Sequence, residues 1–243
     1  MAGESVVAIS ARLGVVAGLC LRGARVADVG ADHGRLAEYL VLQGIARSVI
    51  CTDLNDAPAR KARARVAYLD GRTEVRQGDG LAPIRPGEVD VVCIAGMSGR
   101  LMADILDRGL PVLAEVARVV LQPLCHERAL REWLAANSWR LIGEETAEER
   151  GRQYDTLVAA HGDGRAPYTG NDVDTLLEMG PFLSTRPTDA FQRKWNGKLR
   201  HLREVAAGRA RAGDGVGAAV ADGRIAMIEG VLSREGRAPA PQA

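Results

Sequence analysis

The chain has 243 residues, of which 47% are hydrophobic and 26% charged, and this composition predicts one globular domain with room for a smaller second unit. A net charge of +1 excludes a uniformly basic protein, so any contact with nucleic acid must come from local patches. The four cysteines form no Cys-x-x-Cys pair, which argues against a zinc site or a disulfide framework and fits the cytosol. No apolar run approaches transmembrane length, and the N-terminus lacks a signal-peptide pattern.

Hydrophobic periodicity predicts alternating strands and helices along most of the chain. A leading helix is predicted over 4–21. Strands follow over 25–29, 48–52, 74–77, 89–94 and 118–121. Helices are predicted over 34–43, 57–68, 99–107, 111–116 and 126–137. This alternation is typical of an α/β fold with a doubly wound parallel sheet.

The end of the predicted sheet departs from this alternation. Strands are predicted over 139–145 and 154–160, and the polar connector 148–153 between them is too short for a crossover helix. These two strands should therefore be antiparallel. A parallel sheet closed by an antiparallel hairpin is typical of class I S-adenosylmethionine (SAM) methyltransferases, whereas a nicotinamide-binding domain would continue with another crossover.

Residues 162–170 are rich in turn formers and predict a domain boundary. Beyond them, helices are predicted over 173–179, 190–211 and 216–234, without strands between them. We therefore expect a Rossmann-like domain over 1–163, a small helical domain over 170–235 and a disordered tail over 236–243.

The turn after the first strand is the strongest candidate for a ligand site. Gly30 allows a sharp turn and close approach of a ligand. Asp32 stands where the dinucleotide fingerprint has its second glycine, and its carboxylate would repel a pyrophosphate but suits the cationic amino-acid end of SAM. The predicted donor loop comprises Asp28, Gly30, Ala31, Asp32, His33 and Gly34.

Three further segments follow successive strands. Asp53 and Leu54 stand where a carboxylate can accept hydrogen bonds from ribose hydroxyls. Asp79 and Gly80 follow the third strand, at the place expected for the adenine. Ala95, Gly96 and Met97 follow the fourth strand, where small residues leave room for donor and acceptor. An acidic residue at one strand end is often only a solvated cap, but four such segments in order favour SAM binding.

The chain resembles the bacterial tRNA (adenine-22-N1)-methyltransferase family, often called TrmK. The resemblance rests on ADVGADHGRL (27–36), TD-x-x-DAP (52–58), VRQGDGL (75–81), IAGM (94–97), LQP (121–123), REWL (131–134), YD-x-LVA (154–159), MGPFL (179–183) and the Lys-Trp pair at 194–195. It implies a class I fold, SAM as methyl donor and tRNA as acceptor.

The resemblance also makes Asp32 the candidate for a direct role at the target base. The alternative is that Asp32 only caps the next helix or binds the donor amine. The chain departs from the family pattern at Arg35, Ser98 and Leu124, all of which are expected near the acceptor. These departures concern the acceptor half of the site, whereas the donor half keeps the family pattern.

Two clusters of basic residues are candidates for RNA binding, and either can instead be a solvated helix face. The first is Arg60, Lys61, Arg63 and Arg65. The second lies in the helical domain, where the resemblance implies contact with tRNA. The predicted RNA contacts are Arg35, Arg193, Lys194, Lys198, Arg200 and Arg203. Trp195 is expected to pack the helical arm against the core rather than to stack on a base.

The sequence thus predicts a cytoplasmic, SAM-dependent methyltransferase that modifies N1 of adenine 22 in tRNA. Two alternatives remain open: an enzyme of the same fold that acts on another RNA position or a small molecule, and a catalytically silent tRNA-binding protein. We expect no metal and no membrane partner, and a monomer or weak dimer.

Overall fold

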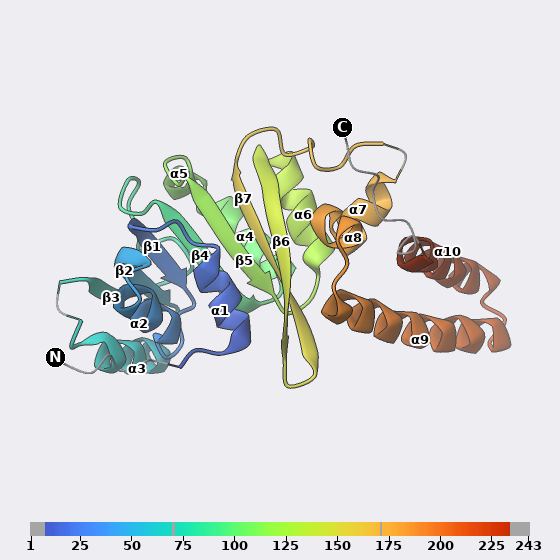
Figure 1. Cartoon of the computed structure of the whole chain (residues 1–243), viewed down its shortest axis with the longest axis horizontal. Helices are drawn as coiled ribbons and strands as arrows, with labels where there is room; N and C mark the ends of the chain where they lie inside the picture. Colours follow the sequence, from blue (N-terminus) through green and yellow to red (C-terminus); the bar gives the residue numbers. More distant parts are fainter. Residues whose placement is uncertain (1–7, 70, 171, 234–243) are drawn as a thin grey trace, which may run out of the picture. The chain divides into compact units, whose positions relative to one another are not determined.

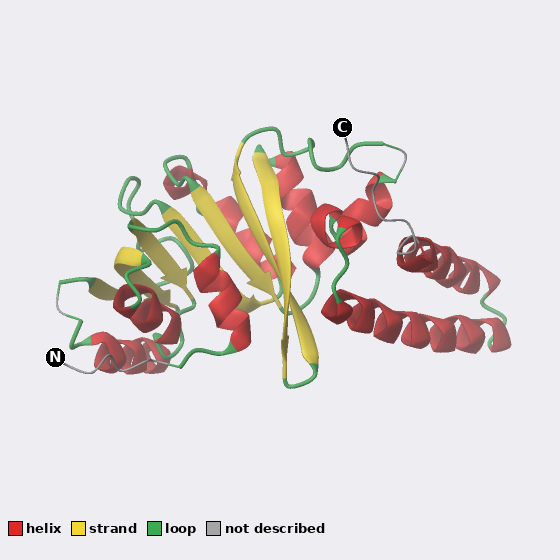
Figure 2. Ribbon diagram, in the orientation of Figure 1, coloured by secondary structure: helices red, strands yellow, loops and turns green. Residues whose placement is uncertain are grey.

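The computed structural model describes residues 8–69, 71–170 and 172–233, and the chain falls into two compact units. One unit comprises Met1–Glu149 and Tyr154–Pro167. The other comprises Arg150–Gln153 and Tyr168–Ala243. The first holds a sheet covered by helices, and the second is built mainly from helices (Figure 1, Figure 2). Within the described ranges, no helix is both long and apolar enough to cross a membrane.

The sheet has seven strands in the order β3-β2-β1-β4-β5-β7-β6. The strands are β1 (Ala24–Val29), β2 (Ala46–Asp53), β3 (Thr73–Gln77), β4 (Val91–Met97), β5 (Arg118–Pro123), β6 (Trp139–Glu149) and β7 (Arg152–His161). The strands β1 to β5 are parallel, and β7 pairs with β5 in antiparallel fashion. This arrangement confirms the predicted class I methyltransferase fold.

Helices cover both faces of the sheet (Figure 1). One face carries α1 (Ala11–Gly18), α2 (Arg35–Leu42) and α3 (Asp56–Val66). The other carries α4 (Gly99–Arg108), α5 (Leu110–Leu113) and α6 (Glu127–Ala136). Because strands in the middle of the sheet are covered on both sides, β5 is buried over almost its whole length.

The closing hairpin is longer than predicted. Strands β6 and β7 take up most of the expected connector and leave only Arg150 and Gly151 between them. Their φ angles of 52° and 74° are those of a two-residue turn that matches the twist of the flanking strands. The two strands form a hairpin, as predicted. Most of the predicted connector belongs to the strands, because an exposed two-stranded ribbon carries polar side chains as a loop does.

Two helix predictions also differ from the structure. The first helix begins at Ala11 because Ser10 caps it, with its Oγ accepting the N–H of Leu13 at 3.4 Å. Residues 4–7 of the predicted helix lie outside the described ranges. The prediction missed α8 (Pro181–Thr185), which Gly180 at φ 91° separates from α7 (Val173–Met179).

In the second unit, α9 (Asp189–Arg211) and α10 (Gly215–Leu232) pack together as a helical hairpin. Its apolar core consists of Met179, Leu183, Phe191, Trp195, Leu199, Ile228 and Val231. Trp195 is 1% exposed, so it packs rather than being free to stack, but it does so in the core of the helical unit itself. The tail predicted to be disordered, 236–243, lies outside the described residues.

Candidate functional site

The loops after β1, β2 and β3 meet at the carboxyl edge of the sheet and are joined by hydrogen bonds. The N–H groups of Gly30 and Ala31 both donate to the carbonyl oxygen of Thr52, at 2.8 and 3.1 Å. The Thr52 hydroxyl donates to the carbonyl oxygen of Gly80 at 2.8 Å. Ligands of doubly wound sheets bind at this edge, so the predicted donor segments converge where a ligand is expected.

The turn after β1 needs glycine at two positions. Gly30 has φ 72°, and a Cβ there would collide with the side chain of Met97. Gly34 has φ 68°, and a Cβ there would lie 3.3 Å from the backbone of Ala62 and from Val66. Both positions combine a left-handed backbone with close packing, so larger residues would displace the turn from β4 and α3.

Asp28 lies beneath this turn and is 4% exposed. Burial raises its pKa to about 7, and the charge of Asp53 acts in the same direction, while a hydrogen bond from the backbone of Ala37 opposes both. Its Oδ2 has no hydrogen-bond partner among the described residues. A buried carboxylate oxygen without a partner is costly, and a cationic group placed beside it would relieve that cost.

Asp32 occupies a strained position above the same turn. Its φ is 49°, which is uncommon for a residue other than glycine. Its N–H donates to Asp53 Oδ2 at 3.2 Å, and its exposed carboxylate lies 2.5 Å from His33 Nδ1. The other oxygen of Asp53 accepts the N–H of Asn55 at 3.0 Å. The loop therefore orients the Asp53 carboxylate through two backbone donors, whereas the Asp32 carboxylate lies beside the ring of His33.

A pocket of about 150 Å³ opens beside Asp28. Its lining consists of Arg12, Leu13, Asp28, Gly30, Ala31, Asp32, His33, Arg35, Leu36 and Ala95. Seven of these ten residues were predicted from the sequence, including the predicted RNA contact Arg35. The pocket combines one buried acid with two arginines, so it can receive a small group that carries both signs of charge.

Arg12 is the one charged lining residue of this pocket that the sequence prediction missed, besides the apolar Leu13 and Leu36. It comes from α1, and its Nη1 donates to the side-chain oxygen of Gln122 at 2.6 Å. Its guanidinium also lies 5.7 Å from the centre of the Tyr154 ring. Gln122 is fully buried and donates from its Nε2 to Pro123. No local pattern marks Arg12, although its partners belong to the quoted LQP and YD segments.

Asp79 and Gly80 line a second pocket, of about 160 Å³, with residues of α4. Asp79 pairs with Arg108, whose Nη2 lies 3.2 and 3.1 Å from the two carboxylate oxygens. Leu54 is 62% exposed, which is unusual for leucine and leaves its side chain available to a flat ligand. Of the predicted donor residues, those outside both pocket linings are Gly34, Asp53, Leu54, Gly96 and Met97.

The residues that depart from the family pattern lie around the same edge. Ser98 caps α4, with its Oγ accepting the N–H of Leu101 at 3.3 Å. Leu124 is 52% exposed, and its N–H donates to the carbonyl oxygen of Met97 at 2.8 Å. The loops after β4 and β5 are therefore joined, and Leu124 presents an apolar side chain where a base could be placed.

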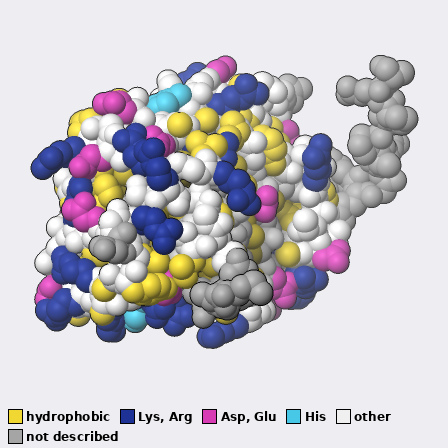
Figure 3. All heavy atoms as spheres, turned by 60° about the vertical axis from the view of Figure 1, so that its left-hand side comes forward, with side chains coloured by type: hydrophobic (Ala, Val, Ile, Leu, Met, Phe, Trp, Pro, Cys, Tyr) yellow, Lys and Arg dark blue, Asp and Glu magenta, His cyan; other side chains and the backbone are white. Residues whose placement is uncertain are grey.

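The two basic clusters lie on different elements, α3 and α9. In the cluster on α3, Arg60 pairs with Asp56, and Arg65 pairs with the buried Glu38 at 2.8 Å. Arg63 donates to the carbonyl oxygen of Val75. The side chains of this cluster therefore stabilise the unit in which they lie. On the face that Figure 3 shows, acidic side chains stand among the basic ones.

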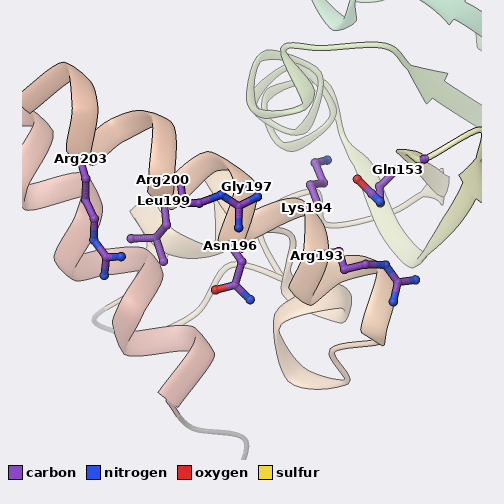
Figure 4. A pocket seen from close by; sticks show the side chains of 9 residues that line it. Gln153, Arg193, Lys194, Asn196, Gly197, Leu199, Arg200 and Arg203 are labelled. Carbon is purple, nitrogen blue, oxygen red and sulfur yellow. The ribbon is translucent and has the colours of Figure 1, made fainter.

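The cluster on α9 surrounds an open pocket of about 840 Å³ (Figure 4). Its lining consists of Gly151, Gln153, Arg193, Lys194, Asn196, Gly197, Leu199, Arg200 and Arg203. Four of the predicted RNA contacts are thus gathered in one place. The fifth on this helix, Lys198, lies with its Nζ 4.2 Å from the centre of the Trp195 ring. Arg203 also pairs with Glu229 of α10 at 2.6 Å.

Comparison with known proteins matches residues 26–213 to the tRNA (adenine(22)-N(1))-methyltransferase family, TrmK. A Bacillus subtilis tRNA (adenine(22)-N(1))-methyltransferase is 39% identical over 199 residues, which are 81% of this chain and 84% of that protein. The chain belongs to this family. The resemblance inferred from the sequence motifs is therefore confirmed.

Solved structures of family members agree with this assignment. The B. subtilis TrmK crystal structure matches with a TM-score of 0.88 and 34% identity, over 93% of this chain and 99% of that chain. A Streptococcus pneumoniae protein in complex with S-adenosyl-L-methionine matches with a TM-score of 0.83 and 34% identity, over 93% of this chain and all of that chain. Both matches extend well beyond residue 167 into the helical unit.

Proposed function

We propose that the protein transfers the methyl group of SAM to N1 of adenine 22 in tRNA. Family membership supports this reaction and its position, and the observation that supports SAM as donor is Oδ2 of Asp28, which is buried beneath the glycine turn without a partner among the described residues. A pyrophosphate would be repelled there, whereas the ammonium group of SAM would supply the missing hydrogen bond and charge. The residues present therefore fit this donor.

The two ends of the donor are assigned to the two pockets at the sheet edge. Asp28 binds the ammonium group, and Arg12 and Arg35 face the carboxylate. Asp53 accepts from the ribose hydroxyls, since each of its oxygens keeps a lone pair beyond the backbone bond described above. The adenine takes the pocket of Asp79 and Gly80, with Leu54 beside it. The remaining backbone contacts come from Gly30, Ala31, Gly34, Ala95, Gly96 and Met97.

The donor supplies an electrophilic methyl group on a sulfonium. The lone pair of adenine N1 forms the new N–C bond while the C–S bond breaks, and its electron pair stays on sulfur. The positive charge thus moves from the donor to the base, and no strong general base is needed. The main task of the protein is alignment, which can be worth several kcal/mol.

Asp32 is our candidate for stabilising the base as its charge grows. Its carboxylate is exposed at the turn, and the N–H donated to Asp53 and the nearby ring of His33 orient it. It can accept a hydrogen bond from the adenine amino group. The target base must leave its stack to reach this position, and the exposed side chain of Leu124 offers it an apolar surface.

We assign tRNA backbone contact to α9, through Arg193, Lys194, Lys198, Arg200 and Arg203, and to Arg35 near the reacting groups. Cations gathered on one element provide the electrostatic contact that a near-neutral protein otherwise lacks. We further propose that the enzyme acts in the cytoplasm as a monomer or weak dimer and without a metal. Within the described ranges, no group of three or more His, Cys, Asp or Glu side chains is arranged to hold one.

The departures at Arg35, Ser98 and Leu124 favour one second candidate: an enzyme of the same fold and donor that modifies another RNA position. The deciding experiment supplies labelled SAM and unmodified tRNA transcripts and identifies the methylated nucleoside after digestion. We expect N1-methyladenosine that disappears when adenine 22 is replaced. Label at another nucleotide would support the second candidate, and absence of donor binding would leave only a silent tRNA-binding protein.

A further inference from the structure

The pocket on α9 contains two kinds of side chain with different uses. Arg193, Arg200 and Arg203 carry charge, whereas Gln153 and Asn196 are neutral amides. Arginine binds phosphate well but reads no sequence through it. An amide with one acceptor and two donors can pair with the edge of a base, as Asn and Gln do with adenine. A site for backbone alone would need only the first kind.

The two amides come from different elements. Gln153 belongs to the hairpin strand β7, next to the turn at Gly151, whereas Asn196 belongs to α9. Figure 4 shows Gln153 apart from the side chains of the helix. Gly197 follows Asn196, and the nearest atom to a Cβ placed there would be Arg200 Nη2 at 4.0 Å. The helix surface is therefore open beside Asn196, and a flat ring can approach the helix backbone there.

The arginines are spaced to hold the backbone on both sides of such a ring. Arg193 and Arg200 are seven residues apart on one helix, which separates their Cα atoms by about 10 Å along its axis. Asn196 and Gly197 lie midway between them. The volume of about 840 Å³ leaves room for a nucleotide together with water. The same helix face thus carries a cation, an amide, a gap and a second cation.

We propose that this pocket binds one unpaired nucleotide of the tRNA, other than the methylated one, and reads its base. Gln153 and Asn196 hydrogen-bond the base edge, while Arg193 and Arg200 hold the flanking phosphates. The pocket then selects the tRNA, whereas the sheet edge carries out the reaction. This proposal rests on the proposed function, because it takes tRNA to be the substrate.

The test measures binding of the full-length protein to a tRNA transcript at several salt concentrations. Arg193→Ala and Arg200→Ala should each weaken binding to every RNA and reduce the salt slope by about one. Gln153→Ala and Asn196→Ala should leave the slope unchanged and weaken binding to the substrate tRNA about tenfold, roughly the value of one base contact. Binding to a poly-uridine strand should not change with the amide variants. Matched controls are Arg211→Ala and Gln43→Ala, both exposed and outside the pocket.

A panel of tRNAs with single-base substitutions then locates the base. At one unpaired position, substitution should weaken binding to the wild type and abolish the difference between the wild type and the Gln153→Ala, Asn196→Ala double variant. Amide variants that weaken all RNAs equally, or none, would overturn base reading. Failure of the proposed function would appear separately, as a wild type that binds tRNA and SAM but methylates no adenine.

Discussion

The two units build their candidate sites in different ways. At the sheet edge, the donor pocket joins residues far apart in the chain, such as Arg12 and Gln122, which are 110 positions apart. Buried groups and backbone hydrogen bonds hold it. On α9, most of the basic pocket comes from residues 193–203, and spacing along one helix places them. The donor pocket needs charges at defined positions, and several elements supply them. A surface that binds a flexible RNA chain can be formed largely by a single helix.

Disrupting the core of the second unit should have the largest effect on the difference between the two sites. Trp195→Ala should destabilise that unit by about 3–5 kcal/mol, because the ring is almost fully buried. Hydrogen exchange should show loss of protection in α9 and α10, and tRNA binding should fall while SAM still binds. The matched variant Trp195→Phe keeps most of the ring contact and removes an indole N–H that is buried in the described structure without a partner. It should cost much less, and equal costs would contradict a packing role.

Asp32→Asn tests the reaction centre. We expect turnover to fall about 100-fold, the usual effect of removing one group that stabilises transition-state charge, with SAM affinity nearly unchanged. Single-turnover kinetics and donor titration separate the two quantities. Asp222→Asn, on the exposed side of α10, is the control. If donor affinity falls as much as turnover, Asp32 serves only to bind the donor.

Arg12→Ala tests how the donor carboxylate is held. Loss of a hydrogen bond to a charged group costs about 1.5–3 kcal/mol, so the Kd of SAM should rise roughly 10- to 100-fold. The Kd of a decarboxylated donor analogue should change little. Calorimetry with both ligands decides the matter: equal losses for both would assign Arg12 to the fold rather than to the carboxylate.

The pH dependence of donor binding tests the role of Asp28. Its folded pKa of about 7 lies above the ordinary value, so burial favours the neutral acid. Its contribution to stability is present at low pH and lost as pH rises through 7, and the free protein should become less stable over that range. A cationic ligand prefers the ionised form, so SAM affinity should increase about tenfold from pH 5.5 to 7. Asp28→Asn should remove most of that dependence, and an unchanged profile would assign it to another group.

Much of the first unit could be predicted because parallel strands place their carboxyl ends at one edge. Acidic and small residues after successive strands therefore indicate Asp28, Asp53, Asp79 and Ala95 from the sequence alone. The basic cluster on α9 could also be predicted, because helical spacing alone puts Arg193, Arg200 and Arg203 near one another. The length of the hairpin was underestimated, since an exposed ribbon of polar residues resembles a loop.

The sequence by itself determined the fold class, the order of the donor segments and the family, since these depend on periodicity and on motifs within short stretches. Only the tertiary structure decided that Arg12 joins the donor pocket, that Asp79 is paired with Arg108, and that Gln153 shares a pocket with α9. It also decided which acid is buried and which is exposed, and hence the raised pKa of Asp28. The physical reason is that burial and pairing depend on distances between residues remote in the chain, which no local pattern encodes.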